Sequence, residues 1–98
     1  MAADPVLNPL KPPESKALAR DIAENGFVEF SSHALVEMKK DGLETTDCLN
    51  LVRAGVFQFP EFEKGEWRYR VCTTRMCIVF AFQSGDRLRV VTAWRNRT

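Results

Sequence analysis

The side chains best suited to chemistry in this chain are one histidine and a set of arginines. His33 is the only histidine among 98 residues, and imidazole is the side chain that most readily takes or gives a proton near neutral pH. It follows Ser31 and Ser32, which are typical helix-capping residues, so we place it in the first turn of a helix. There the positive end of the helix dipole favours the neutral imidazole that can act as a base. The same position also suits a capping or surface histidine.

The arginines lie together at the end of the chain. From Glu66 to Thr98 there are seven arginines, no lysine and two acidic residues, a formal charge of +5, whereas Met1 to Gly65 carries −4. Guanidinium groups match pairs of phosphate oxygens, so this division favours a nucleic-acid or acidic partner. A solvated sheet face is the alternative interpretation. The arginines are Arg68, Arg70, Arg75, Arg87, Arg89, Arg95 and Arg97.

These side chains suffice for cleavage of RNA by its own 2′-hydroxyl group. The reaction needs a base, cations for the charge that develops at phosphorus and an acid for the leaving 5′-oxygen, but no metal ion. His33 or Tyr69 could transfer protons, although Tyr69 alternates with apolar Trp67 and Val71 and could equally lie in the core. The cations best suited to the developing charge are Arg68, Arg70 and Arg95. Other RNA contacts are expected from Lys64, Arg75, Arg87 and Arg89.

Other classes of site have little support in the sequence. No glycine-rich phosphate loop, catalytic triad or metal-ligand cluster has suitable spacing, so we expect no cofactor and no metal. Cys48, Cys72 and Cys77 lie among apolar neighbours, and their odd number favours reduced, buried thiols in the cytoplasm. No apolar run could span a membrane and the proline-rich start is no signal peptide, so we predict a soluble cytoplasmic protein.

The first half of the chain has the apolar period of helices. Met1 to Pro13 is rich in proline and is predicted to be a flexible arm, which leaves residues 14–98 as a single α+β domain. Phe27 to Phe30 is expected to be a short extended connection. Three helices are predicted from their caps and the glycines that end them: Ser15 to Gly26, Ser31 or Ser32 to Gly42, and Thr45 or Thr46 to Gly55.

From Val56 the apolar period changes to that of strands. We predict strands at 56–59, 67–72, 77–82 and 87–95, with turns at 73–75 and 84–86. These strands predict an antiparallel sheet of about four strands, with the helices packed on one of its faces. Alternation then turns Trp67, Tyr69, Val71, Leu88, Val90 and Trp94 towards the helices. It makes the open face a basic platform of Arg68, Arg70, Arg87, Arg89 and Arg95.

Three segments between about Gly26 and Arg95 resemble a small bacterial domain family. They are Phe30-Ser31-Ser32-His33-Ala34-Leu35-Val36-Glu37-Met38, Trp67-Arg68-Tyr69-Arg70-Val71 and Val90-Val91-Thr92-Ala93-Trp94-Arg95. That family reads roughly S-x-H-A-x-x-R-M-x-x-R-G-I near its start and T-V-W-R at its end, and it is grouped with the RelE-like and MqsR-like toxin nucleases. Glu37 and Asp41 stand where the family often has arginine.

The resemblance implies a metal-independent endoribonuclease toxin, or mRNA interferase, of a bacterial toxin-antitoxin system. It implies helices on a twisted antiparallel sheet, single-stranded mRNA as substrate, free or on the ribosome, and a cognate antitoxin as protein partner. By position, His33 matches the family's histidine, Arg68 and Arg70 lie in its basic strand, and Arg95 ends its last strand. The alternative is a non-catalytic RNA- or protein-binding module of the same fold that uses the arginine-rich sheet face.

Overall fold

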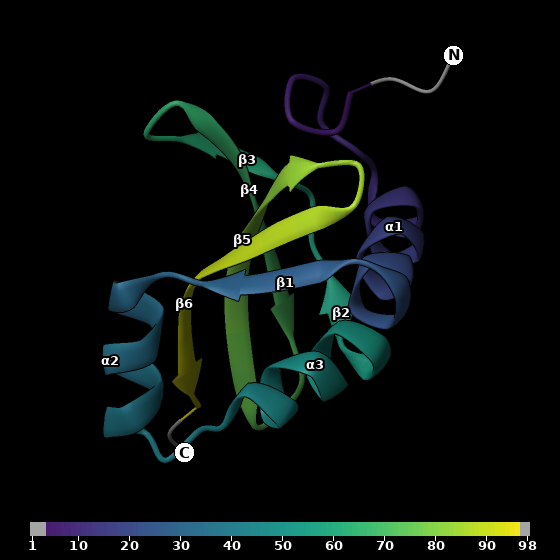
Figure 1. Cartoon of the computed structure of the whole chain (residues 1–98). Helices are drawn as coiled ribbons and strands as arrows, with labels where there is room; N and C mark the ends of the chain where they lie inside the picture. Colours follow the sequence, from purple (N-terminus) through teal and green to yellow (C-terminus); the bar gives the residue numbers. More distant parts are fainter. Residues whose placement is uncertain (1–3, 97–98) are drawn as a thin grey trace.

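Helices and strands combine in an α+β arrangement in the computed structural model, which describes residues 4–96 (Figure 1). Arg97 therefore lies outside the described residues. The helices are α1 (Pro12–Asn25), α2 (Ser32–Lys40) and α3 (Thr45–Ala54). The strands are β1 (Phe27–Phe30), β2 (Val56–Phe57), β3 (Glu61–Glu63), β4 (Glu66–Cys72), β5 (Met76–Ser84) and β6 (Arg87–Arg95).

The helices form where the apolar pattern predicts them, but two of their starts differ. Helix α1 begins at Pro12, inside the predicted arm, because a proline in the first helical turn gives up an N–H that would have no helical partner. Ser15 is therefore not the cap; it is buried and its hydroxyl donates to the Pro12 carbonyl (3.2 Å). Helix α3 is capped by Glu44, which forms a capping box with Asp47, rather than by a threonine. No helix among the described residues is both long and apolar enough to cross a membrane.

The sheet is larger than predicted, and it is mixed. Its strand order is β1-β6-β5-β4-β2, with β3 paired to β4 beside this path. The segment expected to be a simple connection is strand β1, which pairs parallel to β6 and links α1 to α2 (Figure 1). Six strands therefore replace the predicted four. Local pattern could not reveal β1 as a sheet strand, because its partner lies at the other end of the sequence.

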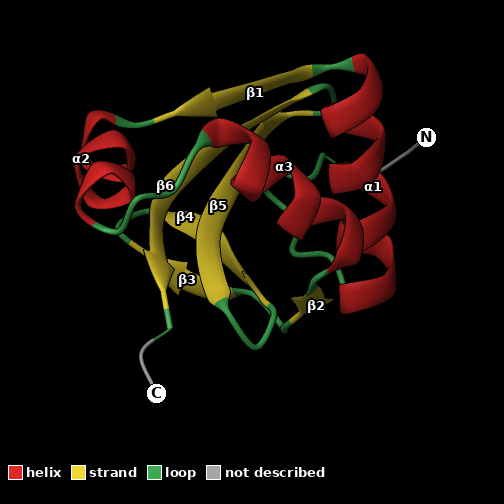
Figure 2. Ribbon diagram, turned by 90° about the horizontal axis from the view of Figure 1, so that it is seen from below, coloured by secondary structure: helices red, strands yellow, loops and turns green. Residues whose placement is uncertain are grey.

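The core lies between one face of the sheet and the helices. Figure 2 shows α1 and α3 together on one side of the sheet, while α2 packs beside β6. Ala19, Ile22, Leu51 and Val52 from the helices are buried in this core. The sheet contributes Tyr69, Val71, Ile78, Phe80, Leu88 and Val90, which are fully buried and which account for most of the predicted inward-facing positions.

A β-bulge in β6 reverses the face that later residues occupy. Phe80 pairs with Val90 but Val79 pairs with Thr92, so Val91 is an extra residue in β6. Beyond it, Ala93 is buried in the core. Trp94 lies on the open face, where the centre of its indole ring is 5.4 Å from the guanidinium carbon of Arg70. The prediction that Trp94 faces the helices is therefore wrong, because one inserted residue shifts the alternation by one.

Two of the three cysteines are joined, which corrects the prediction of reduced thiols. Cys72 and Cys77 form a disulfide between β4 and β5, with their Cα atoms 4.1 Å apart. They are directly opposed in the strand register, so the turn at residues 73–75 brings the two sulfur atoms together. Cys48 is free and buried, and burial, followed by the charge of Asp47, raises the pKa of its thiol to about 11.

Candidate functional site

One groove brings together four of the residues that the sequence singles out. His33, Lys64, Arg68 and Arg89 all line a hollow of about 360 Å³ at the α2 end of the open sheet face. We call it the His33 groove. Its complete lining is Ser31, His33, Lys64, Arg68, Arg89, Val91 and Thr92.

Ser31 fixes the position of His33 against the sheet. Its hydroxyl accepts a hydrogen bond from the Ala34 N–H (3.0 Å), which caps α2, and donates to the carbonyl of Val91 (2.9 Å). Its own N–H donates to the Val90 carbonyl (3.0 Å). The start of α2 is thus bound to the bulge of β6, and the exposed His33, in the first turn, borders the groove.

Lys64 reaches the groove from the tight turn between β3 and β4. It is the non-glycine residue with positive φ (49°) among those described, and Gly65 follows at 81°. Successive positive φ values suit a two-residue hairpin, which is the conformation that joins β3 to β4. The turn therefore presents the Lys64 ammonium group next to the cations of β4 and β6.

The two arginines of the groove share a carboxylate. Arg68 Nε lies 3.0 Å from one oxygen of Glu66, and Arg89 Nη2 lies 3.4 Å from the other. Arg68 Nη1 also lies 3.5 Å from Glu63. Arg68 is largely covered, with 17% of its side chain exposed. The glutamates thus orient both guanidinium groups and offset part of their charge.

The open face as a whole is not the basic platform that the sequence predicts. Arg68, Arg70, Arg87 and Arg89 lie on it, but Glu29, Glu61, Glu63 and Glu66 lie among them. Arg87 pairs with Glu29 on β1 and stacks on Phe27. Alternation within β4 and β6 places the arginines on this face, but it does not reveal the acidic residues that β1, β3 and the start of β4 add to it. Around the His33 groove, the cations Lys64, Arg68 and Arg89 outnumber the carboxylates of Glu63 and Glu66 by one.

Tyr69 lies on the opposite face of the sheet from the groove. Its side chain is fully buried, stacks on Phe80 (5.3 Å between ring centres) and accepts a hydrogen bond from the Leu10 N–H (2.8 Å). Burial raises the pKa of its hydroxyl despite that hydrogen bond. Tyr69 is thus placed as a core residue and does not join His33.

Arg95 and Arg75 also lie away from the groove. Because of the bulge, Arg95 points to the loop after α2, where its Nε donates to the Asp41 carbonyl (3.1 Å). The predicted position of Arg95 on the open face is therefore wrong. Arg75 and Arg95 line a separate cavity of about 260 Å³ beside α3. Asp41 accepts a hydrogen bond from the Arg95 N–H (2.8 Å), and neither it nor Glu37 lines the groove.

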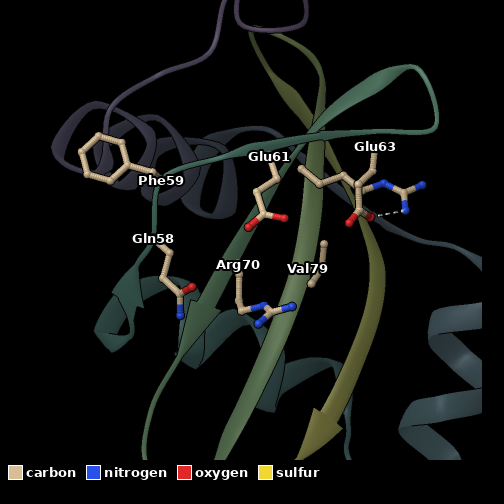
Figure 3. Close-up of a pocket in the computed structure, with 7 residues that line it drawn as sticks. Gln58, Phe59, Glu61, Glu63, Arg70 and Val79 are labelled. Atoms are coloured by element: carbon tan, nitrogen blue, oxygen red, sulfur yellow. Dashed lines mark ion pairs between the residues drawn. The ribbon is translucent and has the colours of Figure 1, made fainter.

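Arg70 lines a second, smaller pocket that adjoins the groove through Arg68. This Arg70 pocket measures about 50 Å³, and Figure 3 shows Glu61 extending from β3 towards it above Arg70. Gln58, Phe59 and Glu61 were not singled out in the sequence. A Glu-x-Glu repeat ahead of a basic strand is the pattern that could have indicated them. The full lining is Gln58, Phe59, Glu61, Glu63, Arg68, Arg70 and Val79.

Among residues 4–96, no three His, Cys, Asp or Glu side chains are grouped so that they could hold a metal ion. Comparisons with protein-family models, with curated proteins and with solved structures give no match to this chain. The chemistry of the His33 groove is therefore the basis on which a function can be proposed. The groove offers an imidazole, three cationic groups and the hydroxyls of Ser31 and Thr92.

Proposed function

We propose that the protein binds single-stranded RNA with a phosphate group in the His33 groove and cleaves the RNA chain there. The single observation that supports this most is the convergence of His33, Lys64, Arg68 and Arg89 on one groove. These residues are distant in sequence and come from a helix, a turn and two strands. An imidazole next to several cations is the combination that metal-independent phosphate transfer requires.

In the proposed reaction the ribose 2′-oxygen attacks the adjacent phosphorus and the bond to the 5′-oxygen breaks. His33 takes the proton from the 2′-hydroxyl group. Arg68 and Lys64 stabilise the negative charge that develops on the phosphate oxygens, and the Lys64 ammonium group gives a proton to the leaving 5′-oxygen. The products are a 2′,3′-cyclic phosphate and a 5′-hydroxyl end. Tyr69, being buried on the other face, has no part in this scheme.

A non-catalytic RNA-binding module is the second candidate, and one observation favours it. Glu63 and Glu66 already pair with Arg68, and Glu66 also pairs with Arg89, so the guanidinium groups of the groove are partly neutralised before RNA arrives. Such a site could hold a phosphate and yet stabilise a transition state poorly. In either case the proposed place of action is the cytoplasm, where mRNA is available.

In a cell, the proposed RNA-cleaving activity would act as a toxin, and a cognate antitoxin would block the groove. This toxin role predicts that induced expression stops growth of a bacterial host and that expression of His33→Ala does not. Growth arrest that persists in His33→Ala would contradict a toxin role based on this site.

The biochemical test uses a short single-stranded RNA, purified protein and EDTA. We expect cleavage in EDTA, because the proposed steps use only protein groups and the 2′-hydroxyl. A matched oligonucleotide with 2′-deoxyribose throughout should remain intact, and mass spectrometry should find 2′,3′-cyclic phosphate ends. Cleavage that stops on chelation, or equal cleavage of DNA, would contradict the mechanism. Tight binding without cleavage would favour the second candidate.

A further inference from the structure

We propose that the Arg70 pocket binds the base of the nucleotide next to the phosphate in the His33 groove, and that it prefers guanine. This inference rests on the proposed RNA-binding function. It concerns Gln58, Phe59, Glu61 and Arg70, which take no part in the proposed cleavage steps.

Two opposite charges face this pocket without forming an ion pair. Arg68 is paired with Glu63 and Glu66. Glu61 and Arg70, in contrast, line the same pocket, and no ion pair or hydrogen bond joins either side chain to another group in the described part of the chain. A carboxylate and a guanidinium that have no ion-pair or hydrogen-bond partner, on one pocket, suit a ligand that carries hydrogen-bond donors and acceptors side by side.

Guanine is the RNA base that matches this pair best. Its N1–H and N2–H groups are adjacent donors, which the two oxygens of the Glu61 carboxylate can accept together, while O6 and N7 accept from the Arg70 guanidinium. Adenine, cytosine and uracil each present a single donor group on the edge used for pairing, so none can engage both carboxylate oxygens and the guanidinium in this way.

The surroundings of the pocket orient one of its two charged groups. The Arg70 guanidinium is stacked on Trp94, which fixes its plane on the sheet. Phe59, 71% exposed, is also among the lining residues, but its ring points away from Glu61 and Arg70 (Figure 3). The pocket volume of about 50 Å³ accommodates the edge of a base, so the base would enter edge-first.

Arg68 joins the two sites, because it lines both the Arg70 pocket and the His33 groove. A base in the first and a phosphate in the second are therefore separated by a single side chain. This spacing suits one nucleotide whose base and neighbouring phosphate are bound at the same time.

The test measures the affinity of short uridine oligonucleotides that carry one variable base, with 2′-O-methyl groups throughout so that they cannot be cleaved. We expect guanine at that position to bind at least about tenfold more tightly than adenine, cytosine or uracil, the scale of one good two-point base contact. Inosine, which lacks the N2 amino group, should fall between guanine and adenine. Fluorescence anisotropy of labelled oligonucleotides gives each dissociation constant.

Glu61→Gln should remove the difference between guanine and adenine, because a side-chain amide offers one acceptor where the carboxylate offers two. Glu24→Gln is the matched control and should keep the preference, because Glu24 is exposed on α1 and does not line the pocket. If all four bases bind with equal affinity, the proposed role of the Arg70 pocket is overturned. If Lys64→Ala abolishes binding in the same assay, the proposed RNA-binding function still holds. Failure to bind any of the oligonucleotides would overturn both.

Discussion

The imidazole of His33 is the residue on which the proposed chemistry depends most. If it removes the 2′-hydroxyl proton, His33→Gln should lower the single-turnover cleavage rate by about 10²–10⁴-fold, the usual contribution of acid–base catalysis. RNA affinity should stay close to that of the wild type, because Lys64, Arg68 and Arg89 remain in place. Quenched-flow measurements with saturating enzyme would show the rate, and an unchanged rate would favour the non-catalytic module.

Tyr69 is predicted to matter for stability rather than for cleavage. Tyr69→Phe removes the hydroxyl that accepts the Leu10 N–H and leaves that part-buried group without its partner. The free energy of unfolding should fall by about 1–3 kcal/mol. Urea denaturation measures this loss. A variant of wild-type stability that no longer cleaves RNA would show instead that the hydroxyl takes part in the reaction.

The buried thiol of Cys48 predicts a pH dependence of stability. Its pKa rises from 9.0 to about 11 on burial, so between these values the folded protein keeps a proton that the unfolded chain has lost. The stabilising effect of the protonated thiol is complete below pH 9 and is lost as the pH rises towards 11. Denaturation at several pH values should show a steeper decline for the wild type than for Cys48→Ala. Parallel declines would contradict the assignment.

The hydroxyl of Ser31 both caps helix α2 and binds it to β6, so a substitution at Ser31 tests how the helix is positioned. Ser31→Ala removes both the cap on the Ala34 N–H and the bond to the Val91 carbonyl. We expect a loss of about 1–2 kcal/mol in the free energy of unfolding, as for other helix caps. Thr46→Ala, on the exposed first turn of α3, is the matched control and should have little effect.

The sequence predicts elements well where the pattern is local. The three helices, the turns at 73–75 and 84–86 and strand β6 follow from caps, glycines and alternation close to each residue. Strand β1 could not be predicted as part of the sheet, since it is defined by a partner far along the chain. Strand β3 was not predicted because its three residues are exposed and carry no apolar pattern.

The candidate site was predictable in part, for the same reason. His33, Lys64, Arg68 and Arg89 could be selected from the sequence because imidazole, ammonium and guanidinium groups suit phosphate chemistry, and the structure brings them to one groove. Arg95 was misplaced because the extra residue Val91 leaves no mark in the apolar pattern. The shared carboxylate of Glu66 was missed because sequence gives net charge but not which charges meet.

At the scale of the whole molecule, the fold brings acidic residues from the first part of the sequence next to arginines from the last part. Glu29 of β1 and the glutamates of β3 lie beside arginines of β6 and β4, so few cations are free to displace counterions from RNA. We expect the logarithm of the binding constant to fall with the logarithm of salt concentration with a slope of about −2 to −3, the value for three or four phosphate contacts with a single strand. Titrations at several salt concentrations measure this slope, and a much steeper one would show that the glutamates release their partners.

The parallel pairing of β1 with β6 also governs when the molecule can be complete during synthesis. His33 leaves the ribosome early, but Arg89 and Thr92, which also line its groove, belong to β6, the last strand in the described part of the chain. A nascent chain that ends before Arg87 has no β6 to pair with β1, and it lacks the lining residues Arg89, Val91 and Thr92. If the proposed function holds, chains stalled at that point should neither bind nor cut RNA, because the groove is complete only after β6 has been synthesised.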